Sequence, residues 1–103
     1  LDAGCGDGIN LQGLSQILAR QAVAADFCAI DYNPKRIERA GKLGIASLAV
    51  GSLTALPYPD EHFDVVLCNH VIEHVPEKAA ALAELRRVLR PDGLIIIGVP
   101  NEG

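Results

Sequence analysis

Apolar residues occur along the chain in five short runs, and the stretches between several of these runs repeat apolar residues at helical spacing. Short apolar runs bounded by turn-forming residues predict β-strands. The run at 63–68 is apolar on both faces from Val65 on, which is typical of a parallel strand covered by helices on both sides. The five strands are expected at residues 1–3, 27–30, 46–50, 63–68 and 94–99.

The first two helices have clear limits in the sequence. Three leucines at helical spacing predict the first helix over about residues 10–21: Leu11, Leu14 and Leu18. The second helix is expected to begin at Asn33–Pro34, because asparagine is a favoured N-cap and proline fits the first helical position. It should run to about Leu43, with Gly44 at its C-terminal cap.

A loop and a turn flank the third predicted helix. Leu56–Asp60 (LPYPD) contains two prolines, which remove two backbone donors, so no regular element is expected there. The helix should begin at Pro76–Glu77 and present one apolar face, made of Leu82, Leu85 and Leu89. Pro91–Gly93 then predicts a turn before the last strand.

This alternation of strands and helices predicts an α/β fold. Strand–helix–strand units of this length form right-handed crossovers and a parallel sheet. The 103 residues suit a single domain, and a composition of 50% hydrophobic and 21% charged residues indicates a folded globular chain.

Composition also restricts partners and location. A net charge of -4 disfavours a nucleic-acid binder, which needs a basic face. No apolar run is long enough to span a bilayer and no signal peptide is evident, so a cytoplasmic protein without membrane contact is expected. The three cysteines are odd in number and never form C-x-x-C, and we expect reduced thiols beside strands at Cys5, Cys28 and Cys68.

The stretch 1–8 (LDAGCGDG) places three glycines between a strand end and a helix. Glycine lets the backbone turn sharply and lets a ligand approach closely, and the following helix N-terminus offers N–H groups to an anion. Ile9 stands where the dinucleotide fingerprint needs glycine or alanine, and no Lys-Ser/Thr pair follows. The loop therefore predicts a different anionic or nucleoside ligand.

Asp31 ends the second strand, 23 residues after Gly8. In a doubly wound sheet this position lies beside the glycine loop, within reach of ribose hydroxyls. An aspartate at a strand end can instead form an Asx-turn into Asn33–Pro34. Together with the glycine loop, it favours a nucleoside ligand.

Four blocks of the sequence resemble successive motifs of class I S-adenosylmethionine-dependent methyltransferases of the small-molecule type: LDAGCGDG, the strand-end Asp31, LPYPDEHFDVVLCNHVIEHV and LRPDGLIIIGVPN. The resemblance covers nearly the whole chain. It implies a Rossmann-like methyltransferase fold, a three-layer α/β/α sandwich whose doubly wound, mainly parallel sheet has the strand order 3-2-1-4-5. That fold has further strands after the fifth, so residues 1–103 are expected to be the S-adenosylmethionine-binding core of a longer domain, lacking the last strands.

The resemblance also implies which residues bind the methionine part of S-adenosylmethionine. Gly4, Gly6 and the backbone near Cys5 would line it. Asp2 would help to place the amino group through water, and Asn69 would contact the methionine portion and face the reacting methyl group.

The adenosine part is implied to lie on the neighbouring strand ends. Asp31 would take the ribose hydroxyls, Tyr32 would pack beside the adenine, and Ser52 and Leu53 would edge it. Many relatives carry aspartate where Ser52 stands, and a serine accepts the adenine amino group more weakly than a carboxylate. Asp92–Gly93 replaces the usual double glycine, a change that a turn tolerates.

His70–His74 (HVIEH) matches an inverted zinc-peptidase motif. That motif requires a helix, whereas this stretch follows a strand and precedes Pro76, so no zinc site is expected. Related methyltransferases with E-x-x-E-H here bind a divalent cation, but histidine at the first position is a poor magnesium ligand, and no metal is expected. Two roles stay open: His70 or His74 accepts a proton from the acceptor, or His74 and Glu73 bond the backbone of the turn.

The predicted function is transfer of a methyl group from S-adenosylmethionine to a small-molecule acceptor at oxygen, nitrogen or carbon. The sequence assigns no catalytic residue, no particular acceptor and no oligomeric state. The alternative is a non-catalytic module that binds S-adenosylmethionine but has lost the acceptor site.

Overall fold

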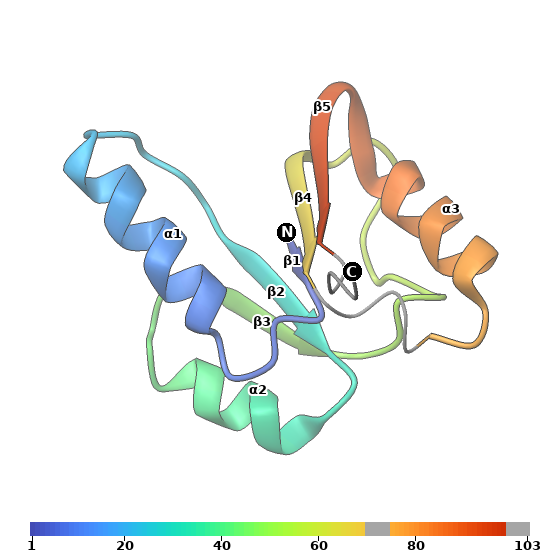
Figure 1. Cartoon of the computed structure of the whole chain (residues 1–103), viewed down its shortest axis with the longest axis horizontal. Helices are drawn as coiled ribbons and strands as arrows, with labels where there is room; N and C mark the ends of the chain where they lie inside the picture. Colours follow the sequence, from blue (N-terminus) through green and yellow to red (C-terminus); the bar gives the residue numbers. More distant parts are fainter. Residues whose placement is uncertain (70–74, 99–103) are drawn as a thin grey trace, which may run out of the picture.

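The computed structural model describes residues 1–69 and 75–98 of the chain. Its centre is a sheet whose strand order is β3-β2-β1-β4-β5, and every pair of neighbouring strands is parallel (Figure 1). This order is the one that the sequence predicted. The strands are β1 (Asp2–Ala3), β2 (Cys28–Asp31), β3 (Ser47–Val50), β4 (Phe63–Asn69) and β5 (Leu89–Gly98).

Helices cover both sides of the sheet, which confirms the predicted α/β/α arrangement. In Figure 1, α1 and α2 lie on one side and α3 lies on the other. The topological switch point lies between β1 and β4. The chain adds β2 and β3 on one side of β1 and then returns to add β4 and β5 on the other side. The helices are α1 (Ile9–Arg20), α2 (Pro34–Gly41) and α3 (Lys78–Val88).

Two apolar clusters lie on the two sides of the sheet, and β2 contributes to both. Ala29 belongs to the cluster that contains Leu11 of α1 and Ala40 of α2. Ile30, the next residue along, belongs to the cluster that contains Leu85 of α3. Successive side chains of a strand point to opposite faces, so a continuous apolar strand joins both layers. This explains why the apolar runs show no alternation in the sequence.

The N-terminus of α2 has the predicted cap. The Asn33 side chain accepts a hydrogen bond from the Lys35 N–H at 3.0 Å, and Pro34 occupies the first helical position. The helix ends at Gly41, earlier than predicted. Gly44 then adopts a left-handed φ of 65°, a conformation that glycine enters without steric cost.

The buried face of α3 differs from the predicted one. The buried residues are Ala81, Leu85 and Val88, whereas Leu82 is 38% exposed. Leu89 lies in β5, because α3 ends one residue earlier. With Leu89 outside the helix, the apolar stripe is completed by Val88 and shifts by one position around the helix axis.

The last strand begins at Leu89, earlier than the predicted Leu94, and has an irregular register. Phe63 pairs with Leu89, but Val65 pairs with Leu94. Between these two pairs β4 has one residue and β5 has four, so β5 carries three extra residues within 90–93, the stretch that contains Pro91–Gly93. Pro91 has no backbone N–H to donate to β4, so a proline is compatible with a stretch where the pairing is interrupted.

One part of the sheet keeps an exposed apolar surface among the described residues. Val65 of β4 and its neighbours Leu94 and Ile96 of β5 share a face and are all exposed. In the described part of the chain, no helix is long and apolar enough to cross a membrane.

A pair of leucines on α3 tests this arrangement. Leu85→Ala should lower the free energy of unfolding by about 2–5 kcal/mol, because Leu85 is fully buried between α3 and the sheet. Leu82→Ala, the matched control on the exposed side, should change it by less than about 1 kcal/mol. Urea unfolding followed by circular dichroism measures both, and equal losses would contradict the observed face of α3.

Candidate functional site

The carboxyl ends of the parallel strands bring most of the predicted site residues to one edge of the sheet. The glycine loop follows β1, Asp31 ends β2, Ser52 follows β3 and Asn69 ends β4. These strands are neighbours in the order β3-β2-β1-β4, so their ends form a continuous row. Open α/β sheets bind ligands at such an edge, where the strand order reverses.

The glycine loop has a left-handed backbone at Gly4, Gly6 and Gly8, with φ values of 80°, 57° and 91°. A Cβ at Gly8 would lie 2.8 Å from a methyl carbon of Leu43 and 3.3 Å from the Cβ of Ala40, so this glycine allows α2 to approach the loop. A Cβ at Gly6 would meet no atom within 4 Å. The side of the loop at Gly6 is thus open to a ligand.

The Asp31 carboxylate holds this loop to the end of β2. Its Oδ2 accepts the Gly6 N–H and its Oδ1 accepts the Asn33 N–H, both at 2.9 Å. The side chain is largely buried, since Asp31 is 4% exposed. Asp31 therefore forms the Asx-type turn into α2 and also lies against the glycine loop, and its binding of ribose hydroxyls stays a prediction.

Backbone bonds add to this connection between the loop and β2. The Ile30 carbonyl oxygen accepts the N–H groups of Gly4 and Cys5, at 2.7 and 3.0 Å. The Asp31 carbonyl oxygen accepts the Gly51 N–H at 3.0 Å, which brings the start of the segment after β3 to the same place. The loop is therefore held in shape before any ligand binds.

Asp2 is a buried carboxylate beside this loop. It is 3% exposed, and its Oδ2 has no hydrogen-bond partner among the described residues. Burial raises the pKa of Asp2 to about 6, and the Asp31 carboxylate acts in the same direction. An unpartnered buried carboxyl group next to a second carboxylate favours a cationic ligand group nearby.

The predicted adenine-side residues have different environments. Tyr32 is 70% exposed, so its ring is free to cover a ligand. Ser52 is exposed, and its Oγ accepts the Thr54 N–H at 3.1 Å and lies 2.7 Å from the Thr54 Oγ1. The Leu53 side chain is buried in the apolar cluster under α3, so only its backbone is available to a ligand.

Asn69 is partly buried at the end of β4, where it pairs with Gly98 of β5. A Cβ at Gly98 would collide with the Asn69 side-chain oxygen. Gly98 therefore makes room for the Asn69 amide, a role that the sequence analysis missed. The signal was a glycine at a strand end directly opposite a polar strand-end residue.

The three cysteines are free thiols. Cys5, in the glycine loop, is buried, and burial together with the nearby Asp2 and Asp31 carboxylates raises the pKa of its thiol to about 12. A thiol with this pKa stays protonated at neutral pH, so Cys5 contributes its backbone and packing and does not act as a nucleophile.

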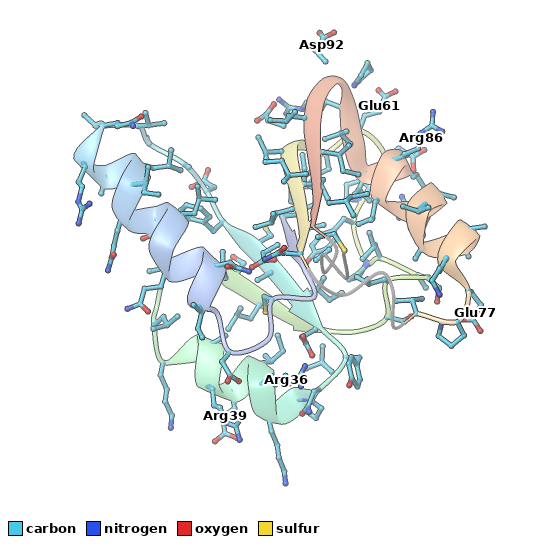
Figure 2. All side chains as sticks on the ribbon, in the orientation of Figure 1. Arg36, Arg39, Glu61, Glu77, Arg86 and Asp92 are labelled. Atoms are coloured by element: carbon cyan, nitrogen blue, oxygen red, sulfur yellow. The ribbon has the colours of Figure 1, made fainter. Side chains whose placement is uncertain are left out.

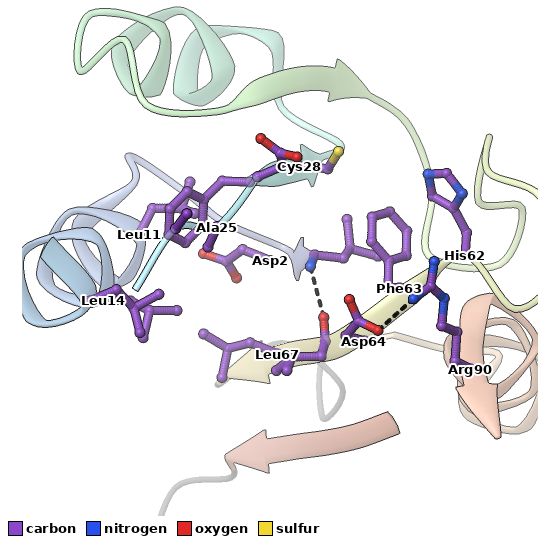
Figure 3. A pocket seen from close by; sticks show the side chains of 16 residues that line it. Asp2, Leu11, Leu14, Ala25, Cys28, His62, Phe63, Asp64, Leu67 and Arg90 are labelled. Atoms are coloured by element: carbon purple, nitrogen blue, oxygen red, sulfur yellow. Dashed lines mark hydrogen bonds and ion pairs between the residues drawn. The ribbon is translucent and has the colours of Figure 1, made fainter. Parts of the chain in front are cut away.

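A cavity of about 640 Å³ lies away from this edge (Figure 3). It is lined by the starts of β2 and β4 and by Leu11, Leu14 and Leu18 of α1. Asp2 is the one predicted site residue that reaches it, and in Figure 3 its carboxylate points toward Leu11 and Leu14. The strand starts lie at the opposite end of a parallel sheet from the glycine loop, so this cavity is not the candidate ligand site.

The histidine hypotheses lie outside the described residues. His70 and His74 belong to the segment 70–74, so neither the proton-accepting role nor the turn-bonding role is decided. Within residues 1–69 and 75–98, no group of three or more His, Cys, Asp and Glu side chains is placed to hold a metal ion.

The arrangement of glycine loop, strand-end aspartate and reversed strand order has a counterpart in known proteins. A family model described as a methyltransferase domain matches residues 1–97. This chain belongs to that family. The matched residues include β1 to β4 and all of β5 except Gly98, so the described sheet belongs to the methyltransferase domain.

Individual relatives agree with the family. The methyltransferase domain is 36% identical to the 2-methyl-6-phytyl-1,4-hydroquinone methyltransferase of a Synechocystis strain, over 99% of this chain and 32% of that protein. It is 36% identical to a probable S-adenosylmethionine-dependent methyltransferase of Mycobacterium tuberculosis, over 98% of this chain and 35% of that protein. The chain thus spans about a third of the length of these curated relatives.

A solved structure supports the same fold. The crystal structure of an S-adenosylmethionine-dependent methyltransferase from Aquifex aeolicus superposes with a TM-score of 0.76 and 26% identity, over 91% of this chain and 53% of that one. The described methyltransferase domain therefore has the Rossmann-like fold of this family.

The buried Asp2 gives a prediction about pH. The folded protein holds its proton up to about pH 6, whereas the unfolded chain releases it near 3.8, so this group lowers stability as pH rises between those values. The loss above pH 6 is on the order of 3 kcal/mol. Asp2→Asn should remove it, raising the free energy of unfolding at pH 7 but not at pH 3.5.

Chemical denaturation across this pH range measures the effect. Asp26→Asn, at an exposed aspartate before β2, is the matched control and should leave the pH dependence as in the wild type. If the free energy of unfolding changes with pH in the same way in the wild type and in Asp2→Asn, the pKa of Asp2 is not raised in the folded protein.

Proposed function

We propose that this methyltransferase domain transfers a methyl group from S-adenosylmethionine to a small-molecule acceptor. The observation that supports the proposal is the hydrogen bond between the Gly6 N–H and the Asp31 carboxylate. Through it, a buried carboxylate at the end of β2 holds a glycine loop whose side at Gly6 is open. S-adenosylmethionine, when bound, supplies an electrophilic methyl group on a positively charged sulfur atom.

Asp31 is proposed to bind the ribose. Each carboxylate oxygen can accept two hydrogen bonds, and each uses one on a backbone N–H. One acceptor position per oxygen remains, which matches two neighbouring hydroxyl groups. The backbone bonds fix the orientation of the carboxylate, so little freedom is lost when the ribose binds.

The methionine part is proposed to lie along the glycine loop, held by Asp2, Gly4, Cys5, Gly6 and Asn69. The open side of Gly6 gives room for it along the loop. Asp2 favours the positive amino group of the methionine part, because a nearby positive charge would lower the free-energy cost of keeping its buried carboxylate ionised. Since Asp2 points toward α1, water is the proposed link between the two groups.

Tyr32, Ser52 and Leu53 are proposed to surround the adenine. Ser52 Oγ already accepts the Thr54 N–H, so it can accept from the adenine amino group only if its own hydroxyl donates to the Thr54 Oγ1. Serine can therefore replace the aspartate of many relatives, with one acceptor position. Tyr32 is exposed enough to pack over the base.

The chemistry requires mainly positioning. Methyl transfer is an in-line displacement at carbon, so a large part of the rate comes from holding donor and acceptor at reacting distance. A general base is needed only when the acceptor loses a proton, and His70 or His74 is the proposed source of that base. A small-molecule acceptor is favoured because the hydroquinone methyltransferase relative is named for one.

The second candidate function is a non-catalytic domain that binds S-adenosylmethionine. It needs only the cofactor edge that the described residues form, where the Asp31 carboxylate holds the glycine loop at Gly6. Both candidates use the same cofactor residues and differ only at the acceptor site.

Asp31→Asn tests the cofactor site. We expect binding of S-adenosylhomocysteine to weaken by about 1–3 kcal/mol, because an amide cannot accept at both positions and loses the charge. Asp26→Asn removes the same charge at an exposed position before β2 and should bind normally. Titration calorimetry, with thermal unfolding to confirm folded protein, gives the comparison, and an unchanged affinity in Asp31→Asn would exclude the ribose role.

A transfer assay separates the two candidate functions. Protein incubated with S-adenosylmethionine labelled in its methyl group and a metabolite extract should yield labelled small molecules, and Asp31→Asn should reduce the yield. Binding of S-adenosylhomocysteine without transfer to any metabolite would favour the non-catalytic domain. Loss of both binding and transfer would reject both candidates.

A further inference from the structure

The segment between β3 and β4 is attached to α3 by one arginine. The Arg87 side chain donates from all five of its N–H groups: to both carboxylate oxygens of Glu84, at 2.6 and 3.1 Å, and to three acceptors in the segment 56–60. Those acceptors are the carbonyl oxygens of Leu56 and Tyr58, at 3.0 and 2.9 Å, and Asp60 Oδ1 at 2.8 Å. A guanidinium group has five N–H donors, so its capacity is filled.

Glu84 completes this arrangement. Its Oε1 accepts the Leu56 N–H at 2.9 Å, so the Leu56 residue is bonded through both its N–H, by Glu84, and its carbonyl, by Arg87. We call Glu84 and Arg87 the clamp. Their paired hydrogen bonds are bidentate and charge-assisted, the geometry that fixes orientation best.

The sequence of the segment explains why it needs the clamp. Leu56 and Tyr58 each precede a proline, and residues before proline are kept out of helical conformations. Their carbonyl groups therefore have no helical partner, and side chains must satisfy them. Backbone bonds from the end of α3 continue the attachment, because the carbonyl oxygens of Arg87 and Val88 accept the N–H groups of Glu61 and His62, both at 2.8 Å.

The other end of the same segment begins at the proposed cofactor site. Gly51 donates to the carbonyl oxygen of Asp31, and the turn that follows contains Ser52 and Leu53. The Leu53 and Leu56 side chains are both buried in the cluster under α3. The Ser52–Leu53 turn is thus held on one side by Asp31 and on the other, three residues after Leu53, by the clamp.

We propose that Glu84 and Arg87 are positioning residues for recognition of the cofactor's base: the clamp sets the place of the Ser52–Leu53 turn, and so the preference for a purine that carries a 6-amino group. The proposal rests on the proposed function, because it assumes that this turn edges the adenine. Glu84 and Arg87 touch no ligand themselves. Their effect reaches the site through the Leu56 backbone.

The test compares two ligands on the same variants. S-adenosylhomocysteine and its purine analogue, with hydrogen in place of the 6-amino group, are titrated by calorimetry. One hydrogen bond from the amino group to Ser52 gives the wild type a roughly three- to tenfold preference for adenine. In Arg87→Gln we expect this ratio to fall toward one.

Arg86→Gln is the matched control. Arg86 is the exposed neighbour of Arg87 on α3, and Figure 2 shows its side chain pointing away from the rest of the molecule. This variant loses the same charge and should keep the wild-type ratio. A clamp that only stabilises the fold would weaken both ligands equally in Arg87→Gln and leave the ratio unchanged, which would overturn the proposal.

A second variant covers the case in which Arg87→Gln does not fold. Glu84→Gln keeps an oxygen for the Leu56 N–H but loses the charged pair with Arg87, and its ratio should fall by a smaller factor in the same direction. A wild-type ratio in folded Glu84→Gln would likewise contradict the clamp, as would equal binding of both ligands by the wild type. Failure of the wild type to bind S-adenosylhomocysteine at all would instead reject the proposed function.

Discussion

The Asp31 carboxylate connects three parts of the chain that are far apart in sequence. Its two oxygens accept N–H groups from the glycine loop, at Gly6, and from the start of α2, at Asn33. Its backbone carbonyl accepts the Gly51 N–H after β3. Charge-assisted bonds in a buried position are strong, so loop, helix and turn keep fixed relative positions. Three of the elements at this edge of the sheet, namely the glycine loop, the start of α2 and the segment after β3, are therefore bonded to this one residue.

The same edge concentrates negative charge. Asp2 lies beside Asp31, its buried Oδ2 has no hydrogen-bond partner in the described part of the chain, and burial raises its pKa to about 6. This arrangement lowers stability at neutral pH, and sites that bind ligands commonly retain such unfavourable groups. A cofactor with a positive sulfur atom and a positive amino group suits it electrostatically. On the other side of the sheet, Glu84 and Arg87 form a complete set of bonds and leave the segment after Ser52 with little freedom.

Features that depend on neighbours in sequence were predicted well. The Asn33 cap and the helix that begins at Pro34 follow from side chains within a few residues of each other. The face of α3 was predicted wrongly, because the end of the helix decides whether Leu89 belongs to it, and β5 pairing sets that end. The bonds of Arg87 to the segment 56–60 were not predicted at all. They join residues 27 to 31 positions apart, and no local pattern indicates them.

The sequence by itself determined the parallel α/β fold, the glycine loop, the strand-end aspartate and, through its motifs, the methyltransferase family. These are properties of periodicity and local conformation, which short segments carry on their own. Only the tertiary structure decided that Asp31 is bonded through both oxygens, that Asp2 Oδ2 has no hydrogen-bond partner within residues 1–69 and 75–98, and that Gly98 makes room for Asn69. Each of these depends on which strand ends meet and on how much water their packing excludes, and both are set by contacts between residues distant in the chain.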